Sequence, residues 1–214
     1  MNQDISKLCA DSLRNSLKDK YGIKLKATHA HHLVAAFFGY GSKTALKAEK
    51  KFPIENLHQA EVIVMVPNEA IDARRVTLND LPENLPDSYT LRGFIYEALF
   101  GSDNWGSQMP PFMSFQSLAK SVVENNEAYK SLYRMSSHVP VHHVVDVGYL
   151  DSEVFLTVYH TFQNPEPAAL IHGKMMIKAS RIAGKIGFGH VKVFPPEKWS
   201  GGYVRKLEAI DLNG

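Results

Sequence analysis

The pattern of apolar and polar positions divides the chain into a helical first part and a strand-rich last part. Apolar residues recur every three or four positions between residues 4 and 20, which predicts an amphipathic helix that ends at Gly22. The same spacing predicts two further helices, at about residues 88–100 and 115–133, each beginning at a serine or aspartate that can cap it. The loop between them combines Trp105 with a Pro-Pro pair, so we expect its aromatic residues to order it.

In the last third of the chain the apolar period changes to two, which is the spacing of β-strands. Two β-branched and aromatic runs, residues 141–149 and 153–162, flank a short polar turn and predict a β-hairpin. Residues 174–182 and 190–194 add two more strands. We therefore expect an antiparallel sheet of at least four strands at about residues 139–212, with helices on one face.

The segment between these two parts holds one short apolar run and one long polar stretch. Residues 61–67 are too few for a helix and end at a proline, which predicts a buried strand. Residues 68–86 are rich in Pro, Asn and Asp and predict an irregular linker on the surface. We expect an α+β fold in two domains, a basic helical module at residues 1–52 and an α+β domain at residues 53–214.

The positions of capping residues and glycines in residues 28–51 predict two short helices joined by a tight turn. Thr28 can cap the first helix, and Ser42 can cap the second. Gly39 and Gly41 between them can adopt the positive φ that turns the chain. In the second helix we expect Ala45, Leu46 and Ala48 to face inward, and Lys43, Lys47, Lys50 and Lys51 to face water. This is the layout of a helix-turn-helix, whose second helix can enter the major groove of DNA. An ordinary helical hairpin has the same capping residues and turn glycines.

The same segment resembles a bacterial family. The residues that carry the resemblance are His29, His32, Ala35, Phe38-Gly39-Tyr40, Ser42, Ala45, Leu46 and Ala48. Residues 24–50 are thereby similar to the glyoxalase-related protein domain, a short helical segment of accessory proteins of unknown role on bacterial plasmids and integrative elements. The stretch Ala73-Arg74-Arg75-Val76 is similar to what often follows that segment. The resemblance implies a bacterial accessory protein and supplies no catalytic residues.

Composition places the chain among ordinary globular proteins. With 214 residues and 44% hydrophobic content, it can bury a sizeable core. Its single cysteine, Cys9, excludes an intramolecular disulfide framework and lies on the apolar stripe of the first helix, which predicts a packed thiol in a reducing compartment. The sequence shows neither a secretory leader nor an apolar stretch of membrane length, so we expect a cytoplasmic protein without a membrane partner.

Charge is distributed unevenly along the chain, although the net charge is only +2. Residues 1–51 hold ten Lys and Arg against four Asp and Glu, a net +6, and the remainder carries −4. This segregation indicates a basic face for phosphate or for an acidic partner, which can be the rest of the same chain. The candidate nucleic-acid-binding residues are Lys43, Lys47, Lys50 and Lys51. A solvated lysine-rich surface is equally compatible, because no aromatic or arginine pattern marks base recognition.

The predicted β-hairpin brings two histidines together. If the chain turns at Asp151-Ser152, His143 lies opposite His160, with their Cβ atoms about 5 Å apart. Two imidazoles at that distance can share a divalent metal such as zinc, with His172 or His138 as a further ligand. We favour a packed or hydrogen-bonded pair at the end of the sheet, and so expect no cofactor.

A second group of histidines, His29, His31 and His32, precedes the glycine turn. His29 and His32 share a helix face, but no neighbour along the chain supplies the further ligands that a metal needs. We expect His29 or His32 to hydrogen-bond within the helical hairpin instead.

No catalytic signature is recognisable in the sequence. The glycines at residues 184–189 match neither a P-loop nor a dinucleotide fingerprint, and they predict a turn between antiparallel strands. No serine or cysteine has a nucleophile-elbow setting. We therefore expect a binding or regulatory protein rather than an enzyme, with nucleic acid or an acidic protein as its partner. Two alternatives remain open, a metal-dependent enzyme that uses His143 and His160, and a structural subunit that binds another protein through the loop around Trp105.

Overall fold

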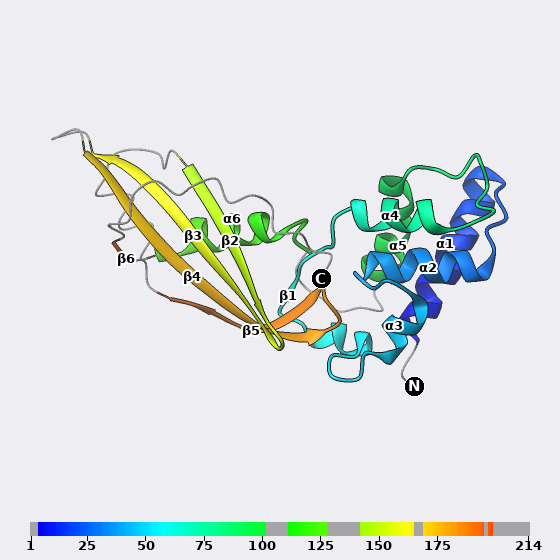
Figure 1. Cartoon of the computed structure of the whole chain (residues 1–214), viewed down its shortest axis with the longest axis horizontal. Coiled ribbons are helices and arrows are strands. Elements are labelled where there is room, and N and C mark those ends of the chain that lie inside the picture. Colours follow the sequence, from blue (N-terminus) through cyan, green and yellow to red (C-terminus); the bar gives the residue numbers. More distant parts are fainter. Residues whose placement is uncertain (1–3, 102–110, 128–141, 165–168, 195–196, 199–214) are drawn as a thin grey trace. The chain divides into compact units, whose positions relative to one another are not determined.

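A computed structural model of the chain describes residues 4–101, 111–127, 142–164, 169–194 and 197–198 (Figure 1). It forms two compact units. Unit 1 comprises residues 1–114 and 180–190, and unit 2 comprises residues 115–179 and 191–214. The boundary therefore differs from the one after residue 52 that the sequence indicated. The loop around Trp105 lies outside the described residues.

Unit 1 is mainly helical (Figure 1). Its helices are α1 (Ile5–Tyr21), α2 (Ala27–Phe37), α3 (Lys43–Ala48), the 3₁₀ helix η1 (Ile54–Gln59), α4 (Glu69–Thr77) and α5 (Ser88–Phe100). Aspartates cap two of these helices, and the cap of α5 is the one that the sequence predicted. The Asp4 carboxylate accepts from the backbone N–H of Lys7 at the start of α1, and the Asp87 carboxylate accepts from that of Thr90 at the start of α5.

The glycine turn between α2 and α3 is also confirmed. Gly39 has a φ of 80°, in the left-handed region. The N–H of Gly39 donates to Ala36 O at 2.9 Å and the N–H of Tyr40 donates to Ala35 O at 2.8 Å. This pair of bonds is a Schellman motif, in which a left-handed residue satisfies the last carbonyls of a helix.

Two details of the helical hairpin differ from the prediction. Helix α2 begins at Ala27 after Lys26, so Thr28 lies inside the first turn and does not cap it. Ser42 caps α3 as predicted, but of the three residues expected to face inward only Leu46 is buried, whereas Ala45 and Ala48 are exposed. A six-residue helix presents little more than one side chain to the core, which explains the difference.

The prediction of an irregular linker at residues 68–86 was wrong for its first half, which forms α4. Only Ile71 of this helix is buried. Its apolar spacing is therefore too weak to show in the sequence. Acidic residues in its first turn and basic residues in its last turn complement the helix dipole.

One hydrophobic core holds unit 1 together. Helix α1 contacts α2 and α5, and α2 contacts α4. The same core includes Leu13 from α1 and Leu57 from η1. It also includes Ile186 from the distant segment 180–190. Residues on both sides of position 52 thus share one core.

The strands form an antiparallel sheet, which confirms the α+β fold with a C-terminal sheet of at least four strands. They are β1 (Val62–Ile63), β2 (His142–Leu150), β3 (Glu153–Asn164), β4 (Ala169–Ala183), β5 (Gly187–Val193) and β6 (Glu197–Lys198). The order is β1-β5-β4-β3-β2, and β6 pairs with β4. The predicted buried strand at residues 61–67 is reduced to the two residues of β1, which pair with β5. Gly184, with a φ of 51°, lies in the turn between β4 and β5, as the turn interpretation of its glycines predicted.

In unit 2, helix α6 (Phe115–Asn125) packs against β2 and β3 (Figure 1). The Phe115 ring meets the Tyr149 ring edge to face, with centroids 6.0 Å apart. The period of two is visible in β3, where Val154, Leu156 and Val158 are buried and the residues between them are partly exposed. The predicted helix at 115–133 ends at Asn125, and residues 128–133 lie outside the described part. None of the described helices is both long and apolar enough to cross a membrane.

Candidate functional site

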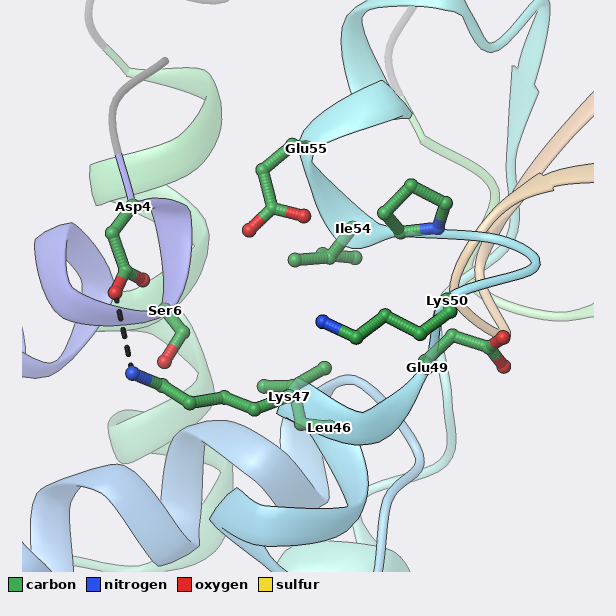
Figure 2. Close-up of a pocket in the computed structure, with 9 residues that line it drawn as sticks. Asp4, Ser6, Leu46, Lys47, Glu49, Lys50, Ile54 and Glu55 are labelled. Atoms are coloured by element: carbon green, nitrogen blue, oxygen red, sulfur yellow. Dashed lines mark ion pairs between the residues drawn. The ribbon is translucent and has the colours of Figure 1, made fainter.

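The structure brings two of the four candidate lysines into one cleft. Lys47 in α3 and Lys50 just after it are exposed and line a cleft of about 430 Å³ (Figure 2). Lys43 lies at the start of α3 and does not line this cleft, and Lys51 covers the Phe52 ring with its amine 5.3 Å from the centroid. The four lysines therefore do not form a single row on one helix face.

We call this cleft the lysine cleft. It lies where the start of α1, helix α3 and the start of η1 meet (Figure 2). Its polar lining consists of Asp4, Ser6, Lys47, Glu49, Lys50 and Glu55. Its apolar lining consists of Leu46, Pro53 and Ile54. Asp4, Ser6 and Glu55 were not predicted from the sequence, because the starts of α1 and η1, which supply them, come together only in the folded chain.

Two of the charges in the cleft neutralise each other. The Lys47 amine lies 3.6 Å from the Asp4 carboxylate, and both side chains are about half exposed, at 54% and 45%. An exposed pair of this kind contributes little stability, on the order of 0–1 kcal/mol. By contrast, neither Lys50 nor Glu55 takes part in an ion pair with any described residue. Figure 2 shows the side chains of both pointing into the cleft.

The Ser6 hydroxyl is the buried polar group of the cleft. Ser6 is 3% exposed, and its Oγ has no hydrogen-bond partner in the part of the chain that the structure describes. A buried hydroxyl without a partner costs roughly 1–3 kcal/mol. The Ser6 hydroxyl would therefore be stabilised by a hydrogen bond to a further donor or acceptor.

Glu49 lines the cleft but its carboxylate is held elsewhere. It accepts hydrogen bonds from the Tyr40 hydroxyl at 3.2 Å and from the backbone N–H groups of Lys51 and Phe52 at 3.1 Å. Arg181 Nη2 pairs with it at 3.2 Å. Burial opposes ionisation of Glu49, but these donors together lower the pKa of its carboxyl below the ordinary value. The network fixes the segment after α3 and with it the neighbouring Lys50.

Tyr40 of the glycine turn thus has a structural role. Burial, with the adjacent Glu49, raises the pKa of its hydroxyl, so Tyr40 stays a neutral hydrogen-bond donor. The turn is further closed by Arg74 of α4, which donates to the carbonyl of Gly41. The Phe38-Gly39-Tyr40 sequence therefore positions α3 and the residues that follow it.

Two histidines of α2, His31 and His32, lie near positively charged side chains. Burial lowers the pKa of His31, and the charges of Lys43 and Lys47 lower it further against the opposing effect of Asp4. Burial also lowers the pKa of His32, followed by the charges of Arg74, His29 and Lys43. Positive charge thus gathers around the end of α2 and the start of α3.

We expected His29 or His32 to hydrogen-bond within the hairpin. This prediction is wrong for the Nδ1 atom of each ring. The Nδ1 atoms of His29, His31 and His32 are buried and have no hydrogen-bond partner among the described residues. The carbonyls of Ala35 and Ala36 at the end of α2 already accept from the backbone N–H groups of residues 40 and 39.

The predicted register of the β2–β3 hairpin is confirmed. His143 pairs with His160, Val145 with Val158 and Val147 with Leu156. Directly paired residues share a sheet face, so the two histidines lie on the same side of the sheet. Among the described residues no group of three or more His, Cys, Asp or Glu could hold a metal ion. His138 and the side chains of His143, His160 and His172 lie outside the described part, so a shared metal stays a prediction.

The charge segregation along the sequence is largely cancelled within unit 1. Residues 53–114 hold three Arg against nine Asp and Glu, a net −6, and they belong to the same unit as the basic residues 1–51. Lys26 pairs with Asp80 at 3.3 Å, and Lys20 approaches Glu97 at 3.9 Å. The acidic partner of the basic helices is thus in part the chain itself.

No family model matches the chain, and no curated protein or solved structure is detectably similar to it. The resemblance of residues 24–50 to the glyoxalase-related protein domain therefore stays a prediction.

Proposed function

We propose that the protein is a bacterial accessory protein that binds nucleic acid through the α2–α3 hairpin and the lysines that follow it. The observation that carries the proposal is the exposure of Lys47 in α3 and of Lys50 just after it, and the electrostatics of the hairpin supports it. Beyond the effect of burial, the pKa values of both His31 and His32 are lowered by neighbouring Lys and Arg side chains. A cluster of cations that repels further protons attracts phosphate for the same reason.

Contact with the phosphate backbone fits this site better than base recognition. Helix α3 has six residues, which corresponds to about 9 Å at 1.5 Å per residue. It is shorter than two turns, whereas a recognition helix lies along the major groove and presents several side chains to base edges. Lysine side chains on a short helix and its following loop contact phosphates without reading sequence.

Binding to duplex DNA at several salt concentrations tests the proposal. We expect the affinity to fall steeply with salt, because each neutralised phosphate releases counterions. The test variant replaces Lys43, Lys47, Lys50 and Lys51 by Gln. The matched control removes the same charge from the middle of the basic segment by replacing Lys18, Lys20, Lys24 and Lys26 by Gln.

The two variants distinguish binding through the proposed lysine surface from binding that depends only on the net positive charge. We expect the test variant to flatten the dependence of log Kd on log salt by roughly 0.9 for each phosphate contact that is lost. The control should keep most of the slope. Equal slopes in the two variants, or an affinity that does not respond to salt, would refute the proposed surface.

A further inference from the structure

The lysine cleft holds two opposite charges that face the same space and are not paired. Lys50 and Glu55 both point into it (Figure 2). No ion pair joins them, and neither pairs with another described residue. Since Asp4 and Lys47 neutralise each other and the Glu49 carboxylate is held by Arg181 and Tyr40, the charge left in the cleft is one cation and one anion.

Ser6 is an independent indication of a ligand. Ser6 lines the cleft and is only 3% exposed, and its hydroxyl lacks a hydrogen-bond partner in the described residues. Buried hydroxyls in folded proteins are satisfied by protein, water or ligand. A ligand with an acceptor oxygen would satisfy this one.

The remaining lining is aliphatic. Leu46 and Ile54 are each 4% exposed and lie beside Pro53 at the cleft. Binding sites for small molecules combine such an apolar lining with a few placed polar groups. A volume of about 430 Å³ has room for a ligand the size of an amino acid.

We propose that the lysine cleft binds a small zwitterion of the aliphatic α-amino-acid class. The ligand carboxylate pairs with Lys50 and accepts from the Ser6 hydroxyl, the ammonium group pairs with Glu55, and the aliphatic side chain covers Leu46 and Ile54. A phosphate with two negative charges fits less well, because Glu55 would face it without compensation. This site goes beyond the nucleic-acid contact proposed above and does not depend on it.

The probe is L-leucine, titrated into the full chain by calorimetry in the absence of nucleic acid. We expect saturable binding at a single site. Two analogues that each lack one charge serve as ligand controls, namely 4-methylpentanoate without the ammonium group and 3-methylbutylamine without the carboxylate. Each should bind at least tenfold more weakly than L-leucine.

Variants of the chain identify the site. Lys50→Met and Glu55→Gln should each weaken L-leucine binding at least tenfold, and Ser6→Ala should weaken it severalfold. Lys24→Met and Glu83→Gln remove the same charges from exposed positions outside the cleft and should leave binding unchanged. Glu55→Gln removes no positive charge, so its effect is distinct from any loss of nucleic-acid binding.

Three results would overturn the assignment. They are no binding of L-leucine at millimolar concentration, binding of 4-methylpentanoate as tight as that of L-leucine, and undiminished binding by both Lys50→Met and Glu55→Gln. Unfolding midpoints of the variants, compared with that of the unaltered chain, distinguish loss of the site from loss of the fold.

Discussion

At the scale of single residues, the two glycines of the turn have different roles. Gly39 has a φ of 80°, and a Cβ there would meet side-chain atoms of Lys185 and Val66 at 3.2 Å. Gly41 lies outside the left-handed region, and a Cβ there would meet only Arg74 Nη2, at 3.7 Å. The sequence predicted this difference, because Gly39 directly follows the last apolar residues of the helix.

Replacing these glycines measures the difference. Gly39→Val should lower the free energy of unfolding by about 1–3 kcal/mol, because a β-branched residue is strained in the left-handed region. Crowding against Lys185 and Val66 acts in the same direction. Gly41→Ala should be milder. Thermal unfolding of both variants checks this, and equal tolerance would mean that the Schellman motif does not hold the hairpin.

Glu49 makes stability depend on pH in a definite direction. Because its pKa is lowered in the folded chain, its contribution is present above the ordinary pKa of about 4.5 and is lost as the pH falls through the folded value. We therefore expect Glu49→Gln to be less stable than the unaltered chain at pH 7 and the gap to narrow below about pH 4.5. Urea unfolding between pH 3 and pH 7 measures the gap. A gap that is constant over this range would show that the Phe52 and Lys51 N–H groups, the Tyr40 hydroxyl and Arg181 do not stabilise the ionised form of Glu49.

At the scale of elements, a helix or strand could be predicted from the sequence when residues close together along the chain determine its structure. The register of the β2–β3 hairpin was predicted to the residue, because its alternating pattern and short turn together fix the pairing. Helix α4 was missed, because only Ile71 of it is buried and its position depends on contacts with residues outside the helix. Arg75, for example, donates to the carbonyls of Pro86 and Leu85 at 2.6 and 3.2 Å, and these bonds anchor the chain after the helix.

The hairpin register makes the histidine pair testable. His143 and His160 are opposite each other whatever their role. We expect a pair without metal, so elemental analysis of protein purified without chelator should give well under one zinc per chain. One zinc per chain that is lost in His143→Ala and kept in His58→Ala, an exposed histidine of η1, would instead support the metal-dependent enzyme.

At the scale of the whole molecule, the parts that sequence could not predict are those assembled from distant segments. The lysine cleft combines the start of α1 with α3 and η1. Unit 1 needs residues 180–190, which follow most of unit 2 in the sequence. Local periodicity carries no information on how distant segments assemble. The charge distribution and the helical pattern therefore indicated a single domain boundary after residue 52.

The last prediction tests whether residues 180–190 belong to the fold of unit 1. Ile186 is fully buried in the core shared with Leu57, and its carbonyl accepts from the N–H of Val64 at 2.8 Å. Ile186→Ala should cost about 2–5 kcal/mol, because it leaves a cavity in that core. Hydrogen exchange should then speed up in α1 and α2 and change little in β2 and β3.

The matched control is Leu156→Ala, at a position of β3 in unit 2 that is 1% exposed. It removes a side chain of the same size and should speed exchange in β2 and β3 more than in α1 and α2. The contrast matters because both variants lower stability overall, whereas only the distribution of exchange rates reports which unit a residue completes. If Ile186→Ala loosened the β2–β3 hairpin as much as the helices, the assignment of residues 180–190 to the helical unit would be wrong. The Arg181 contact that positions Glu49 and Lys50 would then need another explanation.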